Sequence, residues 1–356
     1  MAEPVYTTRE AIKRALQIGE TAENDQEIDR CIASTARIID GYCHRTFYPM
    51  TATRKFDWPS IQGALPWRLW VDDCDVISVS AISSTGGGAI PVGNIFLENN
   101  RTGPPYDRIE LNLSSASAFG GGNTYQQSIL VTGLFGYSNN ETAVGTVIEA
   151  LDASETAIDV DAATSSMVGV GSILRFDDER VIVTERDFLT TGATLAGNLD
   201  GQQKTVTVPV SNGALFARGE VVVLDSESVL VLRVVGNNLT VRRAYDGSVI
   251  AAHTSGITIY GPRTLSVQRG ALGTTAAVHL TGSTVNRWDP PPGPRQLNNA
   301  MAISDLMQEK TGWFRTMSAS SNFGGTSRRS ATMESIIDLR QQVTQQYGRK
   351  ARQRTI

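Results

Sequence analysis

A line of 22 residues that occurs twice constrains the fold of this chain more than any other feature. Residues 239–260 read LTVRRAYDGSVIAAHTSGITIY, and residues 265–286 read LSVQRGALGTTAAVHLTGSTVN. Laid over one another without a gap, the two lines share eight of 22 positions, which indicates a duplicated structural unit. The shared positions are Leu239/Leu265, Val241/Val267, Arg243/Arg269, Gly247/Gly273, Ala251/Ala277, His253/His279, Gly256/Gly282 and Thr258/Thr284.

The two copies of the unit are predicted to be nested. The line before the first repeat, residues 216–234, has its counterpart at 168–186, far upstream of the second repeat. A stacked array would give each copy its own preceding line, but only the first copy has one beside it. The aligned positions in these lines are Gly219/Gly171, Asp225/Asp177, Glu227/Glu179, Val229/Val181 and Val231/Val183.

Copy B is then continuous over 188–262, and copy A is split into 146–187 and 263–288. The two halves of copy B are joined by VGNNL (235–239), whose glycine and asparagines favour tight hairpin turns. Copy B therefore takes the place of a hairpin turn in copy A. Hairpin tips tolerate inserted domains because their two ends lie close together. We expect two nested, mainly β inserted domains.

Composition narrows the class of protein. With 40% hydrophobic and 19% charged residues, the chain is ordinary for a globular protein of two or three domains. Neither a membrane-spanning run nor a signal peptide is recognisable, so we expect a product of the cytoplasm with no membrane partner. Cys31, Cys43 and Cys74 lack metal-site spacing and are predicted to be buried reduced thiols. The net charge of −4 argues against broad nucleic-acid binding.

The regions that flank the repeat are predicted to form a base of helices and β-hairpins, at 1–143 and 289–329. The first helix is expected to open at a capping box formed by Thr7 and Glu10. Between 67 and 137, alternating apolar residues and glycine-rich turns indicate strands joined by hairpins. The overall class is thus α+β. Two further helices carry the apolar stripes Ile28, Ile32, Thr35, Ile39 and Tyr42, and Leu297, Ala300, Met301, Ser304 and Met307.

The last segment, 330–356, is predicted to be an extended C-terminal arm. A glycine- and serine-rich line precedes a fourth helix whose apolar face has no evident partner in the sequence. The segment could be a frayed solvated end, a nucleic-acid contact or an arm that folds onto a protein partner. We favour the arm, because amphipathic spacing indicates a face that becomes buried. Its apolar residues are Ile336, Leu339, Val343 and Tyr347, and its basic residues are Arg340, Arg349, Lys350, Arg352 and Arg354.

Candidate chemical groups are few. His253 and His279 occupy the same position of the two copies, which favours a shared structural role, such as a bond to a turn carbonyl, over catalysis or metal binding. The acidic cluster of Asp72, Asp73 and Asp75 is expected to be a solvated strand entry, because a hard metal ion needs more ligands at defined spacing.

The three tryptophans Trp58, Trp67 and Trp70 are expected in a core or a subunit contact and not in a sugar platform. The sequence contains no phosphate-binding loop, nucleophile elbow or zinc-protease motif. We therefore predict no catalytic, metal-binding or cofactor-binding residue. The chain is expected to be a structural protein and not an enzyme.

The base resembles the head-to-tail connector, or adaptor, proteins of long-tailed bacteriophages. The stretches that carry the resemblance are DQEIDRCIASTARIIDGYCHRTFYP, FDWPS, LWVDDCDVISVSAI, PPYDRIELN, ILVTGLFGYS and the return to a helix after PPPGPRQLNNA. Together they lie within about 200 residues, at 1–143 and 289–356. The line RGALGTTAAVHLTG also looks like β modules of phage neck and tail proteins.

The resemblance implies a ring of copies, expected to number twelve, that lies under the portal vertex of the capsid in the virion. It implies that the C-terminal arm binds the portal protein, that the other end meets a neck, stopper or tail-completion protein, and that DNA passes through the lumen. The nested β insertion departs from the family's pattern. An alternative prediction is therefore a β-rich virion surface module in which the repeats bind a host glycan.

Overall fold

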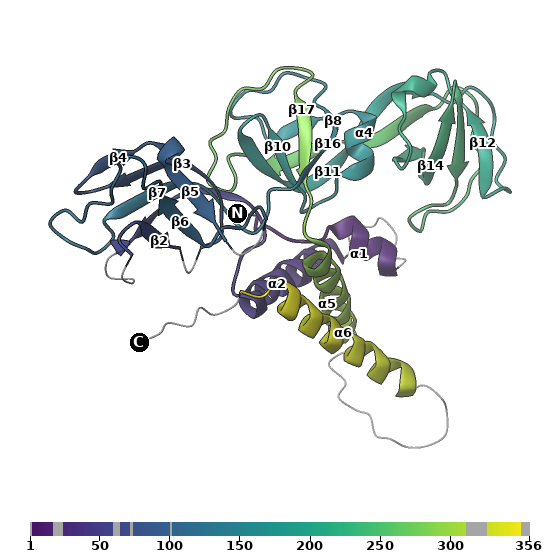
Figure 1. Cartoon of the computed structure of the whole chain (residues 1–356). Helices are drawn as coiled ribbons and strands as arrows, with labels where there is room; N and C mark the ends of the chain where they lie inside the picture. The colour runs from purple at the N-terminus through teal and green to yellow at the C-terminus, as the bar shows by residue number, and fades with distance from the viewer. Residues whose placement is uncertain are drawn as a thin grey trace.

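The computed structural model is a mixed α+β protein with more strand than helix, 37% against 23%, in several antiparallel sheets (Figure 1). The predicted α+β class is therefore confirmed. Three β units lie in a row, and the helices gather beneath them. The structure describes residues 2–16, 24–59, 65–71, 74–99, 102–310 and 326–349.

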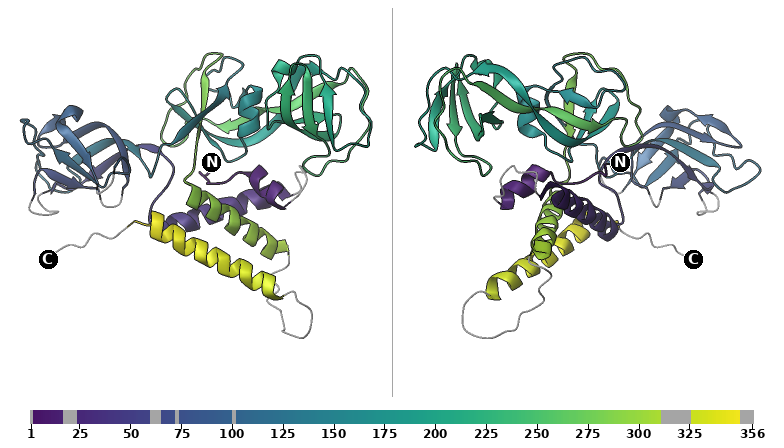
Figure 2. Two further views of the ribbon diagram at one scale, coloured as in Figure 1. Left: turned by 45° about the vertical axis from the view of Figure 1, so that its right-hand side comes forward. Right: turned by 180° about the vertical axis from the view of Figure 1, so that it is seen from behind.

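Four helices from the two ends of the chain form a bundle. α1 (Arg9–Leu16) and α2 (Asp25–Cys43) meet α5 (Pro292–Lys310) and α6 (Thr326–Tyr347), and the last three lie side by side (Figure 2). The expected stripe of α2 is buried from Ile28 to Ile39, but Tyr42 is 38% exposed. Cys31 and Cys43 are buried free thiols as predicted, while Cys74 is half-buried beside Arg54.

The capping box predicted at the start of α1 does not form. The hydroxyl of Thr8, and not that of Thr7, accepts a hydrogen bond from the backbone N–H of Ala11 at 3.3 Å. The Glu10 carboxylate turns away from its own helix and accepts the backbone N–H of Val170 in copy A at 3.0 Å. A tertiary contact has thus displaced the local one, and it ties α1 to the repeat.

α5 buries only part of the stripe predicted for it, because Leu297 lies in the core and Met301 packs against it, but the other buried positions are shifted. Leu297, Ala302 and Leu306 are each 1% exposed, whereas Met307 is 54% exposed. Asn298 is fully buried on the same helix. Its side-chain amide donates a hydrogen bond to the Thr35 hydroxyl at 2.7 Å and accepts one from the backbone N–H of Tyr6 at 3.1 Å, which offsets the cost of burying a polar group. Because a polar residue lies at the centre of the helix contact, the spacing of apolar residues does not predict which face of α5 is buried.

The strands that follow α2 form a separate unit, here named the β body (residues 50–135). Its two sheets, in the orders β1-β7-β3-β4 and β2-β6-β5, enclose one hydrophobic cluster. That cluster shares no residue with the cluster of the bundle, so the expected base is built around two cores. Its strands are β1 (Met50–Phe56), β2 (Arg68–Trp70), β3 (Val76–Ser84), β4 (Gly88–Ile90), β5 (Ile95–Glu98), β6 (Arg108–Leu111) and β7 (Ile129–Phe135).

The repeat forms one continuous antiparallel sheet in the order β12-β15-β14-β13-β16-β11-β10-β17-β8, with β9 added to β16. Copy A contributes β8 (Glu141–Thr146), β9 (Ala157–Asp159), α4 (Ala162–Met167), β10 (Ile173–Phe176) and β17 (Thr284–Trp288). Copy B contributes β12 (Thr205–Pro209), β13 (Val221–Leu224), β14 (Glu227–Val235) and β15 (Asn238–Arg242). The long strands β11 (Glu179–Thr194) and β16 (Thr258–Gln268) run through both copies.

The strand register of the two copies coincides. In copy B a two-residue turn joins Val235 to its partner Asn238. The corresponding pair in copy A is Asp187 and Thr264, and both ladders slip at the same point, after Val183 and after Val231. Residues 188–263 therefore replace, in copy A, the two turn residues Gly236 and Asn237 of copy B. The insertion thus ends at residue 263, one residue later than the sequence predicted.

Each copy has a hydrophobic cluster of its own. One comprises residues between 144 and 183 together with Leu265, Val267 and Val285, and the other comprises residues between 193 and 259. Copy A also touches the β body, because the backbone N–H of Thr51 donates to Leu272 at 2.9 Å. Gly273 makes this approach possible: its φ is +78°, and a Cβ there would lie 1.9 Å from the Thr51 carbonyl oxygen.

Candidate functional site

The most concentrated group of titratable side chains lies inside copy B. Glu227 is fully buried, and its carboxylate accepts hydrogen bonds from Nε of Arg243 at 3.1 Å and from Nη2 at 2.7 Å. The Nε2 atom of His253 lies 2.9 Å from the same carboxylate, and its Nδ1 atom lies 2.8 Å from the exposed carboxylate of Asp225. The backbone N–H of Ala251 adds a further bond at 3.0 Å.

Copy A repeats this network. Arg269 reaches Glu179 at 2.7 and 2.8 Å, and His279 lies 2.9 Å from Glu179 and 2.8 Å from Asp177. The backbone N–H of Ala277 completes the set at 2.9 Å. The four side-chain positions are thus occupied by the same residue types in both copies, with matching bonds.

The two histidines make matching contacts in the two copies, but their partners are carboxylates and not the expected turn carbonyl. Both imidazoles bridge two carboxylates. Burial raises the pKa of Glu179 and Glu227, but bonds from arginine, histidine and backbone N–H groups outweigh it and hold each pKa at about 2. The repeat itself contained the signal, because Asp177/Asp225 and Glu179/Glu227 align along with the histidines.

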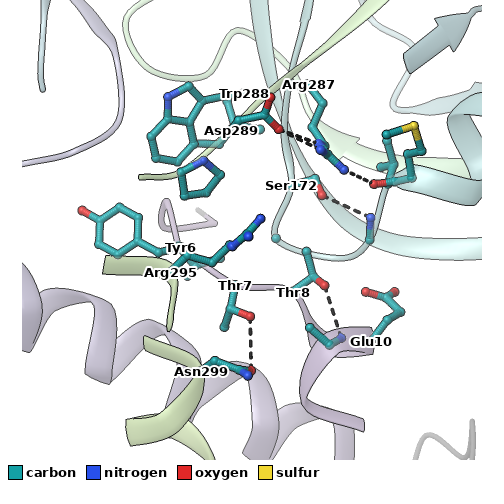
Figure 3. Close-up of a pocket in the computed structure, with 18 of the residues that line it drawn as sticks. Tyr6, Thr7, Thr8, Glu10, Ser172, Arg287, Trp288, Asp289, Arg295 and Asn299 are labelled. Carbon is teal, nitrogen blue, oxygen red and sulfur yellow. Dashed lines mark hydrogen bonds and ion pairs between the residues drawn. The ribbon is translucent and has the colours of Figure 1, made fainter. Parts of the chain in front are cut away.

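A pocket of about 520 Å³ lies where the N-terminal segment, copy A and the start of α5 meet (Figure 3). Its charged groups are engaged within the fold: Arg287 bonds Asp289 at 2.7 Å and the Met167 carbonyl at 2.6 Å. The Ser172 hydroxyl accepts the backbone N–H of Gly169 at 3.1 Å. The lining residues that the structure describes include neither histidine nor cysteine. This pocket is a joint between the N-terminal segment, copy A and α5.

The predicted docking helix packs its apolar face inside the chain. Val343 and Tyr347 are 2% and 8% exposed and belong to the core of the bundle, with Leu339 packed against them. Ile336 is half-buried. The prediction that this face lacks a partner within the chain is therefore wrong.

The partner is an aromatic cluster formed by segments far away in the sequence. The ring of Tyr347 lies 6.0 Å from that of Phe47 and 5.7 Å from that of Tyr137, and Tyr6 meets Phe47 at 5.5 Å. Gly293 of α5 lies directly against Tyr347, because a Cβ there would be 2.5 Å from the ring. These contacts anchor α6 at its C-terminal end.

The end of α6 is also held by polar contacts. The backbone N–H of Arg349 donates to the Cys43 carbonyl at 2.9 Å, and its guanidinium lies 3.2 Å from Asp75. Arg45 meets the same carboxylate at 3.3 Å. Arg340 lies over the Tyr42 ring at 5.1 Å. The remaining predicted docking residues, Lys350, Arg352 and Arg354, lie outside the described residues.

The acidic cluster expected near residue 72 takes a different form. Asp75 is buried and ion-paired with arginines, in place of the predicted solvated strand entry, while Asp72 and Asp73 lie outside the described residues. Among residues 2–349 that the structure describes, no group of three histidine, cysteine or acidic side chains is arranged to hold a metal ion.

Two of the three tryptophans make the predicted core contact in the β body, whereas Trp70 is half-buried against Arg68 and Arg108. Trp58 stacks on Tyr125 at 5.3 Å, and its indole N–H donates to the Phe119 carbonyl at 2.9 Å. Trp58 and Trp67 pack against the hydrophobic cluster of the β body.

Comparisons with protein-family models, with curated proteins and with solved structures find no match for this chain. No helix in the described part of the chain has the length and apolar character needed to cross a membrane.

Proposed function

We propose that this chain is a structural subunit of a bacteriophage neck. Its copies form a ring, with twelve as the expected number, which joins the capsid portal to the neck and tail and extends the DNA conduit. Its proposed location is the virion, beneath the portal vertex. Its partners are the portal protein, other copies of itself and a neck, stopper or tail-completion protein.

The observation that carries this proposal is the anchored end of α6. Arg349 is fixed to Cys43 and Asp75 where the bundle meets the β body. The basic tail at 350–356 therefore begins at a defined point of a packed body. A short charged tail on a rigid support loses less conformational freedom on docking than a long mobile arm.

The proposed docking segment is therefore narrower than the sequence indicated. Val343 and Tyr347 stay in the core, and the tail residues Lys350, Arg352 and Arg354 meet an acidic surface of the portal. Several tails in one ring engage together, so that a weak single contact gives strong overall binding.

The net charge of the chain supports the proposal that DNA passes through the ring. The whole chain carries a net charge of −4, which disfavours the counterion release that makes proteins adhere to DNA. Its buried acids Glu179, Glu220 and Glu227 are ion-paired inside the repeat. Such charges stabilise the fold.

The test is a tail variant in which Lys350, Arg352 and Arg354 are replaced by glutamine. We expect binding to purified portal rings to weaken at least about tenfold in a sedimentation assay, and the remaining binding to respond less to salt. A matched variant with alanine at Gln353 and Thr355 should bind as the unaltered chain does. Unchanged portal binding by the neutral tail would overturn the proposal.

A further inference from the structure

The two copies of the repeat differ in what covers one face of their sheets. In copy A, Ile173 and Ile182 are each 2% exposed and belong to the cluster of the bundle. The common register puts Val221 and Leu230 at these positions in copy B. Both are only partly buried and belong to none of the hydrophobic clusters of the described residues.

The same face is more apolar in copy B than in copy A. Three polar positions of copy A become apolar, and two of the new side chains, Leu232 and Tyr260, are 37% and 42% exposed. The exchanges are Arg175 to Val223, Thr184 to Leu232 and Asn286 to Tyr260. Apolar side chains are unfavourable on a face that contacts only water. A contiguous apolar patch of this kind therefore indicates a contact surface.

The rim of the face has also changed charge. In copy A, Glu185 lies 2.7 Å from Arg9, and the Gln268 side chain accepts a backbone N–H of the N-terminal segment at 2.6 Å. Copy B has the exposed residues Arg233 and Arg242 at these two positions. Arg242 lies over the Tyr245 ring, which Arg14 of α1 also covers, so Arg233 is the residue of this rim that fits a second, apolar surface carrying carboxylates.

The β body offers such a surface. Val92, Phe96 and Leu113 are 42%, 49% and 70% exposed. Glu98 lies two residues after Phe96 on β5 and shares its face of the sheet. On β6, Glu110 lies opposite Phe96, and Arg108, which lies opposite Glu98, is itself bonded to Asp107 and Glu110. The β body and copy B lie at opposite ends of the row of β units (Figures 1 and 2).

We propose that the outer face of copy B, formed by Val223, Leu230, Leu232 and Tyr260 with Arg233, docks on the β5 surface of a second copy of this chain. Apolar side chains meet across the contact, and Arg233 faces Glu98. A contact between unlike ends of one molecule is heterologous, and it closes into a ring when repeated around an axis. This inference rests on the ring proposed above and assigns its subunit interface.

The test is a charge reversal with a rescue. Arg233→Glu is expected to weaken association between copies of the full chain about tenfold or more, measured by sedimentation equilibrium and by ring formation on portal particles. Lys55→Glu makes the same change of charge at an exposed position of β1, and it should have no effect. Adding Glu98→Lys to Arg233→Glu should restore association to near the original value, because the pair is then reversed.

Two results would overturn the contact: Arg233→Glu associates as well as the unaltered chain, or its loss is not rescued by Glu98→Lys. These results are distinct from failure of the proposed function. If the unaltered chain and Arg233→Glu both form a collar on the portal, the contact is wrong and the connector role stands. If the unaltered chain neither associates nor binds the portal, the connector role fails.

Discussion

Each copy of the repeat buries a carboxylate, Glu179 or Glu227, and surrounds it with an arginine, a histidine and backbone N–H groups. The arginine comes from the strand after the hairpin, and the histidine comes from the following loop. The network therefore fastens a loop without regular structure to the sheet. A buried charge is tolerated only while its partners remain, which makes these residues sensitive to single substitutions.

Removing either arginine should destabilise the chain strongly. Arg243→Met leaves Glu227 buried without its main partner, so we expect a loss of about 3–5 kcal/mol in the free energy of unfolding of copy B. Arg269→Met should have a similar effect in copy A. The measurement is urea unfolding followed by circular dichroism, because residues 188–263 contain no tryptophan. Arg242→Met, at an exposed neighbouring position, should cost less than about 0.5 kcal/mol; equal losses at 242 and 243 would contradict the network.

The carboxylates of Glu179 and Glu227 also predict that the stability of the chain depends on pH. Their pKa in the fold is about 2, below the usual glutamate value, so their stabilisation is complete above about pH 4.5 and is lost as the pH falls toward 2. Each contributes up to about 3 kcal/mol across that window. Thermal unfolding midpoints at a series of pH values should fall steeply below about pH 4.5. Glu227→Gln should flatten the fall, and an unchanged slope would contradict the assignment.

Among the elements, those that repeat or alternate were predictable. The eight matched positions predicted the repeat, and the aligned lines 168–186 and 216–234 predicted the nesting. The register of β11 with β16 repeats that of β14 with β15. The contacts of α6 and α5 were not predictable. Tyr347 packs on Phe47 and Tyr137, more than 200 residues away in sequence, and Asn298 is a polar residue at the centre of a helix contact. Local periodicity contains no information about either partner.

The register makes the nesting testable. Replacing residues 188–263 by Gly-Asn joins Asp187 to Thr264 with the turn that copy B uses between Val235 and Asn238. We expect the shortened chain to fold, because its cluster in copy A and the contacts of Ile173 and Ile182 with the bundle remain. Circular dichroism and a cooperative thermal transition are the measurements. Loss of structure in the shortened chain would show that the halves of copy A depend on copy B.

The anchoring of α6 gives a further prediction. Tyr347→Ala removes a ring packed against two others and should lower the free energy of unfolding of the bundle by about 3 kcal/mol. Gln346→Ala, on the exposed side of the same turn, is the control and should change stability little. Thermal unfolding compares the two variants. Equal midpoints would contradict the burial of α6 in the chain.

At the scale of the whole molecule, a bundle built from both chain ends supports a row of three β units. The row ends in two surfaces that differ in charge, and the basic tail follows the anchored end of α6. This arrangement fits a subunit that meets its neighbours sideways and a different partner at its tail. On this account the duplicated unit has two uses, since copy A is fixed to its own bundle and copy B contacts the adjacent subunit.

Electron microscopy of portal rings mixed with the purified chain tests the connector role most directly. Portal rings taken from the virion that contains this chain are imaged with and without the protein. The account predicts an added collar on the portal axis, with one copy of the chain per position of a closed ring. Portal rings that stay bare at saturating concentrations of the chain, or chains that attach singly and off the axis, would contradict it.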